Sequence, residues 1–190
     1  MKVIGTVGLN GSGKDTLIEY LHEQYQVLVL STGDLVREMA EKRGIRPTRA
    51  NLHELSQQAM EEHGADYFAR RVIDQIDQDW DVVGIAGIRT PTDVETFRQH
   101  FGDDFILVCV KVGDIHTRFE RVRERDAARD PQAYDRFLQQ EEQEKELFHV
   151  EQAMEMADIT VENDDSLDAF YDEIEKKVVT PVLKGVKEKK

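Results

Sequence analysis

Residues 8–16, with the sequence GLNGSGKDT, constrain the fold of this chain more than any other segment. Gly8, Gly13 and Lys14 have the spacing G-x-x-x-x-G-K, which is typical of a loop whose backbone N–H groups bind phosphate. The apolar run KVIGTVG before the loop predicts a strand, and the segment after it has apolar residues at helical spacing. A phosphate-binding loop between a strand and a helix indicates a sheet that is covered by helices.

One position of this loop departs from the usual pattern. The residue after the lysine is normally Ser or Thr, whose hydroxyl binds magnesium, but here it is Asp15 and the threonine follows as Thr16. The glycines let successive N–H groups turn toward one anion, and the N-terminus of the next helix adds partial positive charge. We therefore still expect a nucleoside triphosphate to bind here, with Lys14 between its β- and γ-phosphates.

Strand and helix patterns alternate along the rest of the chain. Short apolar runs predict strands at 2–8, 26–33, 81–88, 104–112 and 158–163. Helical spacing predicts helices at 14–25, 34–42, 48–64, 66–78, 90–102, 114–130, 132–157 and 166–178. Strands separated by helices in this way predict an α/β fold, with a five-stranded parallel sheet between two layers of helices.

Two helical segments are too long to be simple crossovers between strands. They cover about 34–64 and about 118–140, and we expect both to lie over the carboxyl edge of the sheet, where ligands bind in such folds. We expect a single domain over 1–180. Pro181 and the lysine-rich end predict a flexible tail over 181–190.

The charge and cysteine content argue against several kinds of partner. The formal net charge is −14, which disfavours non-specific binding to nucleic acid or to an anionic membrane. We see neither an apolar run of membrane-spanning length nor a signal-peptide pattern. The one cysteine, Cys109, lies in an apolar run and is expected to be buried, so we expect a cytoplasmic protein. The acidic excess fits either an ordinary solvated surface or a high-salt cytoplasm.

Three further groups of residues follow predicted strands. The segment STGDLVR at 31–37 combines a helix N-terminus with Arg37, which suits a second phosphate, although an ordinary helix cap gives the same pattern. The segment AGIR at 86–89 places Arg89 at the carboxyl edge of the sheet. The third group is a series of arginines for which pairing with nearby glutamates is the alternative, and it comprises Arg118, Arg121, Arg125 and Arg129.

Taken together, these motifs resemble adenylate kinase and other nucleoside monophosphate kinases. STGDLVR is similar to their acceptor-binding signature, AGIR stands where they carry Asp-Gly followed by an arginine, and the arginine series stands where they carry a lid. ADITVEND and SLDAFYDEI resemble their last strand and helix. The resemblance covers residues 2–180 and is greatest to the archaeal adenylate-kinase-related, dephospho-CoA-kinase-like branch. It implies the three-layer P-loop NTPase fold, an acceptor-binding insertion, a short lid, and ATP and Mg²⁺ as cofactors.

The resemblance also implies roles for individual residues. The residues implied in catalysis are Lys14, Arg89, Arg121 and Arg125. Those implied in holding ATP are Gly8, Asn10, Gly11, Ser12, Gly13, Lys14, Asp15, Thr16 and, beside the base, Asn163. Those implied in holding the acceptor are Thr32, Gly33, Arg37 and Arg89. The metal is expected at Asp15 and Thr16.

Two positions depart from the pattern of this family. The acid that organises magnesium after the third strand is Ala86 here, and Gln139 and Gln140 stand close to the place of a phosphoryl-contacting arginine, with Arg136 slightly upstream. Phosphoryl transfer depends on metal charge and positioned arginines more than on any one side chain. We therefore expect Asp15 to supply the carboxylate that Ala86 lacks, directly or through water.

The leading hypothesis is an enzyme that transfers the γ-phosphoryl group of ATP to a nucleoside monophosphate such as AMP. One alternative is transfer to a hydroxyl, as in dephospho-CoA, with Asp34 as the general base. A second is a nucleotide-binding sensor without efficient transfer, which Ala86 and Gln140 favour. We expect a small-molecule nucleotide as partner, no nucleic acid or membrane partner, and a monomer or homodimer. The histidines lie singly on predicted helices, without the spacing of metal ligands.

Overall fold

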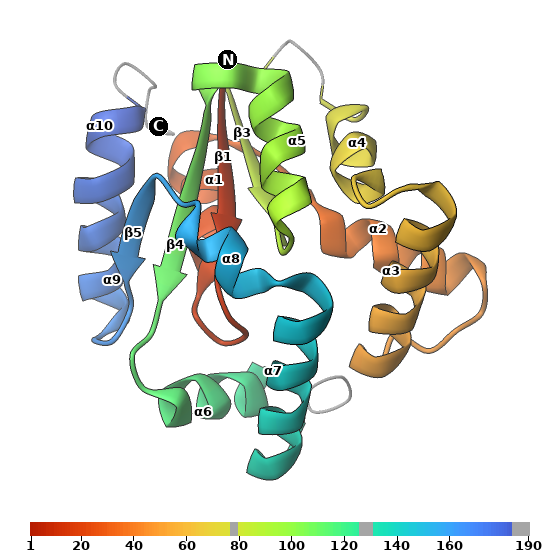
Figure 1. Cartoon of the computed structure of the whole chain (residues 1–190). Coiled ribbons are helices and arrows are strands. Elements are labelled where there is room, and N and C mark those ends of the chain that lie inside the picture. The colour runs from red at the N-terminus through yellow and green to blue at the C-terminus, as the bar shows by residue number, and fades with distance from the viewer. Residues whose placement is uncertain (77–79, 126–130, 184–190) are drawn as a thin grey trace.

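A parallel sheet lies at the centre of the molecule (Figure 1). The computed structural model describes residues 1–76, 80–125 and 131–183, and within these residues the sheet has five strands in the order β2-β3-β1-β4-β5. Every neighbouring pair of strands is parallel. The strands are β1 Lys2–Val7, β2 Leu28–Ser31, β3 Val82–Ala86, β4 Phe105–Lys111 and β5 Ile159–Glu162. The predicted fold class is confirmed.

Helices cover both faces of this sheet, which explains why its strands are almost continuous apolar runs. On one face, α1 packs through Leu17 and Leu21 and α9 packs through Phe170. On the other face, α4, α5 and α8 pack against the sheet through residues such as Val72 and Phe97. These helices are α1 Lys14–Tyr25, α4 Tyr67–Ile73, α5 Pro91–Phe101, α8 Val150–Glu155 and α9 Leu167–Ile174.

The helical insertion after β2 has a small apolar core of its own. Val36, Leu55 and Phe68 are buried there, one from each of α2, α3 and α4. Helix α2 begins at Thr32, two residues before the predicted start, because the hydroxyl of Ser31 accepts the backbone N–H of Asp34 and caps the helix. The two helices not yet placed are α2 Thr32–Lys42 and α3 Arg49–His63.

The predicted lid is built on two helices that cross below the sheet (Figure 1). They are α6 Ile115–Arg125 and α7 Tyr134–Phe148, and they pack through Phe119, Val122 and Phe137. Residues 126–130, which include the predicted Arg129, lie outside the described residues.

The long helix predicted at 132–157 is wrong, because the structure breaks it into α7 and α8. His149 has φ 52° and ψ 40°, in the left-handed region, and its N–H donates to the carbonyl of Lys145 to close α7. No glycine or proline marks this break in the sequence. The break turns α8 onto the sheet and leaves Phe148 and Val150 lining a cavity at the carboxyl edge.

The C-terminal segment is also more ordered than predicted. After α9 the helix continues through a π-helical turn at Glu175–Val179 into α10, Thr180–Val182. Leu183 is buried in the core that contains α1, so a flexible tail starting at Pro181 is wrong for this stretch. The rest of the predicted tail lies outside the described residues.

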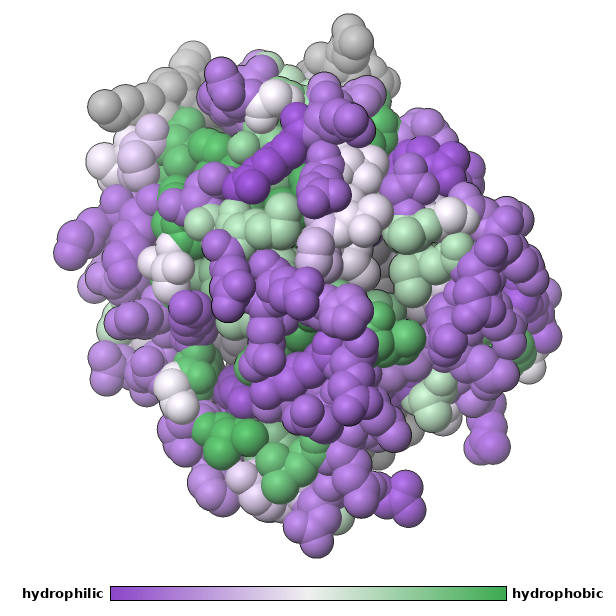
Figure 2. Space-filling model, viewed as in Figure 1, coloured by the Kyte–Doolittle hydropathy of each residue, from purple (hydrophilic) through white to green (hydrophobic). Residues whose placement is uncertain are grey.

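The exterior and interior differ sharply in polarity. Hydrophilic side chains predominate on the face shown in Figure 2, in keeping with the charged fraction of 34%. Burial raises the pKa of the Cys109 thiol to about 11, as expected for an unreactive core cysteine. Among the described residues, no helix has the length and apolar character needed to cross a bilayer.

Candidate functional site

The loop between β1 and α1 has the geometry of an anion cradle. Gly11 and Gly13 have φ of 79° and 95°, which side chains other than glycine rarely adopt. A Cβ at Gly11 would collide with the backbone carbonyl of Arg118, and one at Gly13 with the side-chain amide of Asn163. Gly13 is the N-cap of α1, so the free N–H groups of that helix face the same point.

Two residues distant in sequence hold this loop in place. The side-chain amide of Asn163 donates to the carbonyl of Ser12 at 2.8 Å, and Arg118 donates to the carbonyl of Asn10 at 3.2 Å. The hydroxyl of Ser12 is buried and has no hydrogen-bond partner among the described residues. The positive-φ glycines and the free N–H groups at the start of α1 fit a bound phosphate, so the residues present suit the triphosphate that the sequence predicts.

A cavity of about 670 Å³ opens from the loop across the carboxyl edge of the sheet. Most of the predicted site residues line it, and they are Gly8, Asn10, Gly11, Gly13, Lys14, Asp15, Thr16, Gly33, Arg37, Arg89, Arg121 and Arg125. The cavity lining does not include Ser12, Thr32 or Asn163. The structure therefore brings the predicted donor and acceptor residues to one space, which is where open α/β sheets bind ligands.

Beside the loop between β1 and α1, the charged groups of the cavity include Lys14 and Asp15. Burial lowers the pKa of the Lys14 ammonium below its ordinary value, and the adjacent carboxylate of Asp15 opposes this shift. In turn, Lys14 holds the pKa of Asp15 below its ordinary value, and Arg125 contributes with its guanidinium 3.9 Å from the carboxylate. Asp15 is thus an anion at the mouth of the cavity, with 53% of its side chain exposed.

The predicted acceptor residues of the STGDLVR segment have different surroundings. Thr32 is buried, and its hydroxyl donates to the carbonyl of Gly87 at 2.6 Å, so it joins the start of α2 to the turn after β3. Arg37 reaches the cavity and forms an ion pair with Asp34 at 2.5 Å on the same helix. The helix cap is supplied by Ser31 and not by Thr32 or Asp34, whereas Arg37, the predicted cation, lines the cavity.

Of the predicted lid arginines, two line the cavity. Arg121 donates to the backbone carbonyl of Asn163 at 3.1 Å, and its other terminal nitrogen is buried without a partner among the described residues. Arg125 donates to the side-chain carbonyl of Asn10 at 3.2 Å. Arg118 lies outside the cavity lining, because it is buried in an ion pair with Glu141 of α7.

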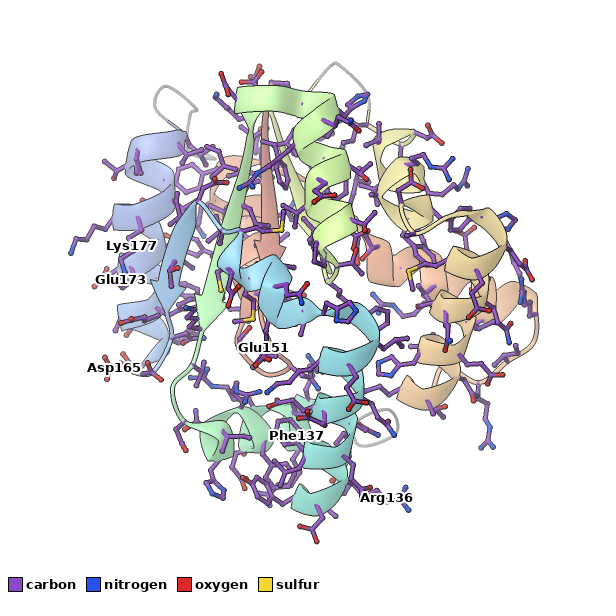
Figure 3. All side chains as sticks on the ribbon, in the orientation of Figure 1. Arg136, Phe137, Glu151, Asp165, Glu173 and Lys177 are labelled. Carbon is purple, nitrogen blue, oxygen red and sulfur yellow. The ribbon has the colours of Figure 1, made fainter. Side chains whose placement is uncertain are left out.

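The two departures from the family pattern are visible in the structure. Ala86 ends β3 and lines the cavity without a carboxylate. Gln140 is not among the lining residues. Arg136 points outward from α7, whereas its neighbour Phe137 turns toward α6 (Figure 3). Arg136 is therefore not placed to replace the missing phosphoryl-contacting arginine.

A group of cavity residues was missed from the sequence. Glu144 of α7 accepts hydrogen bonds from Arg49 at 2.6 Å and His53 at 3.0 Å, and Arg89 lies 3.6 Å away. Phe148 packs beside them, with the guanidinium of Arg89 5.3 Å from its ring centre. Burial alone would raise the pKa of Glu144, but Arg89, His53 and Arg49 hold it well below its ordinary value. The i,i+4 spacing of Arg49 and His53, and that of Glu144 and Phe148, is visible in the sequence. No sequence pattern indicates that α3 and α7 meet at the cavity.

Comparison with known proteins places the chain in a family. A family model described as an AAA domain matches residues 7–137. The UPF0200 protein of Halobacterium salinarum is 35% identical over 92% of this chain and 90% of its own length. The chain belongs to this UPF0200 family, and more than half of it matches the AAA domain model. A UPF0200/UPF0201 protein of Archaeoglobus fulgidus is 36% identical over 98% of the chain, which spans 57% of that longer protein.

Solved structures with a fold similar to that of this chain include two kinases. A gluconokinase from Sinorhizobium meliloti has a TM-score of 0.55 at 15% identity and covers 90% of this chain and 88% of its own. A shikimate kinase from Acinetobacter baumannii has a TM-score of 0.57 at 17% identity and covers 93% and 92%. These similarities concern the fold, which is that of the P-loop kinases.

Proposed function

We propose that this UPF0200 protein transfers the γ-phosphoryl group of ATP, with Mg²⁺, to a nucleoside monophosphate. The observation that carries the proposal is the single cavity that joins a phosphate-binding loop to a second set of arginines. Lys14 stands at one part of this cavity, and Arg37 and Arg89 stand at another. Phosphoryl transfer between nucleotides requires that the anionic donor and the anionic acceptor are held next to each other in one cavity.

The donor part of the site fits a metal-bound triphosphate. The loop N–H groups and Lys14 bind the phosphates, and the arginines of α6 neutralise charge as the phosphoryl group moves. The described residues contain no cluster of three or more acidic, histidine or cysteine side chains that would hold a metal by itself. Mg²⁺ is commonly held by one or two side chains together with the phosphates, and Asp15 and Thr16 are the residues that would supply them here.

The acceptor part suits an anionic substrate with an apolar group. Arg37, Arg49 and Arg89 all line it, and Leu52 and Phe148 add apolar surface suited to a base. A phosphate acceptor is already ionised at neutral pH and needs no general base. Asp34, the candidate base for a hydroxyl acceptor, is 70% exposed and is engaged by Arg37.

To test this proposal, the rate of ADP formation is measured with ATP, Mg²⁺ and each of a panel of acceptors in turn. We expect turnover with a nucleoside monophosphate and a loss of about 100-fold or more in kcat/KM for Lys14→Ala. Lys176→Ala is the matched control, because Lys176 is exposed on the C-terminal helix. Binding of ATP without turnover on any acceptor, and with no gain for Ala86→Asp, would favour the sensor hypothesis. Turnover only with dephospho-CoA would favour the hydroxyl acceptor.

The role of Asp15 has a test of its own. Asp15→Ser restores the usual loop sequence but removes the carboxylate beside Lys14. If the carboxylate compensates for Ala86, this variant needs several times more Mg²⁺ for half-maximal activity. Unchanged magnesium dependence would show that Asp15 has no part in holding the metal.

A further inference from the structure

Three basic side chains converge on one oxygen atom at the acceptor end of the cavity. That atom is Oε1 of Glu144, which is 2.6 Å from Arg49 Nη1, 3.0 Å from His53 Nε2 and 3.6 Å from Arg89 Nη1. All four residues line the cavity. Donors from different elements that meet at one oxygen are the usual arrangement around a bound phosphate oxygen.

The basic groups are held in place by the fold around them. Arg49 and His53 lie one turn apart on α3, with 9% and 11% of their side chains exposed, whereas Arg89 follows β3. Phe148 contacts two of them, with the His53 ring edge-on at 5.5 Å between centroids and the guanidinium of Arg89 near its face. These side chains do not need to be gathered by a ligand, because packing already directs them to one point.

We propose that Arg49, His53 and Arg89 form a binding point for a phosphate group of the acceptor, and that Glu144 fills this point until the phosphate displaces it. This inference rests on the proposed function, because it assigns an acceptor to the same cavity. Glu144 is then a positioning residue: it keeps the two arginines apart and directed inward, and it sets how strongly an acceptor must bind in order to enter.

Charge balance favours a phosphate monoester over a carboxylate as the incoming group. Two guanidinium groups and the imidazole of His53 meet the carboxylate of Glu144 at this point. A phosphate dianion neutralises both arginines and offers more oxygens to their planar forks. A carboxylate substrate would only repeat the charge of Glu144 and would have no electrostatic advantage in displacing it.

Binding of inorganic phosphate tests the displacement directly and uses no ATP. All proteins carry Lys14→Ala, so that the β1–α1 loop takes up little of the probe. Glu144→Gln keeps the shape and an acceptor oxygen but removes the competing charge. We expect it to bind phosphate at least about tenfold more tightly by isothermal titration calorimetry, since a like charge a few Å away is removed. Acetate, the second probe, is expected to gain much less.

Three variants show whether the gain arises at this point. Glu142→Gln, on the exposed side of the same helix, is expected to bind phosphate like the parent. Glu144→Asp keeps the charge and is expected to show no gain. Adding Arg49→Gln to Glu144→Gln is expected to abolish the gain. Circular dichroism on each variant establishes that it is folded before its affinity is compared.

The opposite result has a clear meaning. If Glu144 only orients the arginines, Glu144→Gln binds phosphate more weakly than the parent or no better, and the displacement proposal is wrong. An equal or larger gain with acetate would overturn the assignment to phosphate. Because these measurements need no turnover, failure of the kinase assay leaves their outcome standing, and the two proposals can fail separately.

Discussion

Glu141 and Glu144 lie three residues apart on α7, and each binds arginine in a different way. Glu141 binds Arg118 through both carboxylate oxygens, with about 6% of each side chain exposed, and Lys145 lies 4.0 Å from one of these oxygens. Glu144 uses one oxygen for three basic groups and lies at the wall of the cavity. The residue type and the helix are the same, but the first carboxylate is sealed in protein and the second can be reached by a ligand.

The difference shows how one helix serves two purposes. The Glu141–Arg118 pair ties α7 to α6, and through the carbonyl of Asn10 it also ties both helices to the phosphate-binding loop. The contacts of Glu144 reach across the cavity to α3 and to the turn after β3. Under the proposed function, the sealed pair fixes the half of the site that would hold ATP, whereas the accessible carboxylate leaves the half that would hold the acceptor open to exchange.

Removing the sealed carboxylate is expected to have the largest effect on stability. Glu141→Ala leaves the guanidinium of Arg118 buried without its partner, and such a change costs about 3–5 kcal/mol in the free energy of unfolding. Urea denaturation followed by circular dichroism measures it. Glu142→Ala, exposed on the same helix, is expected to stay within about 0.5 kcal/mol of the wild type. A loss for Glu141→Ala below about 1 kcal/mol would mean that water already reaches Arg118.

Glu144→Gln is expected to lower the free energy of unfolding by less, about 1–2 kcal/mol at pH 7. The basic partners of Glu144 border the cavity, and the amide oxygen of the glutamine can still accept their hydrogen bonds. The difference from the wild type also depends on pH. The folded-state pKa of Glu144 lies below its ordinary value of 4.5, so its contribution is complete above that value and is lost as pH falls below it toward the folded pKa. Urea titrations from pH 7 to pH 3 measure this loss. A difference that stays constant over this range would contradict the charge assignment.

The smallest effect on stability is expected when both members of the sealed pair are replaced. The double variant Arg118→Met/Glu141→Leu replaces both charged side chains with apolar side chains of similar volume. Such a replacement often changes the free energy of unfolding by no more than about 1 kcal/mol. ATP affinity is nevertheless expected to fall, because Asn10 loses the donor that holds its carbonyl. Denaturation and ATP titration on the same preparation separate the two effects. Unchanged ATP affinity would show that the loop keeps its shape without Arg118.

Local patterns were enough to predict most of the fold. Most residues of the buried strands are apolar, and the glycine and lysine spacing of the loop identifies the turn between β1 and α1. The break at His149 was missed because a histidine in the left-handed region has no distinctive sequence signal. The burial of Leu183 was not predicted, because it depends on packing against residues of α1, which is distant in sequence.

The candidate site was less predictable than the fold. Residues beside a motif, such as Lys14 and Arg89, were named correctly as lining one cavity, because each follows a strand at the carboxyl edge. Arg49 and Glu144 are 95 positions apart and each resembles an ordinary helix-surface charge until α3 and α7 are placed. The side-chain amide of Asn163 donates to the carbonyl of Ser12, and its place beside the base of ATP stays a prediction.

The contact between Gly11 and the backbone carbonyl of Arg118 has an evolutionary consequence. Because the carbonyl belongs to the main chain, changing the side chain at position 118 does not make room for a Cβ at position 11. Descendants of this sequence can therefore lose the Arg118–Glu141 pair and still be unable to replace the glycine. Among relatives that keep α6 in this position, the glycine should therefore be retained more widely than the ion pair.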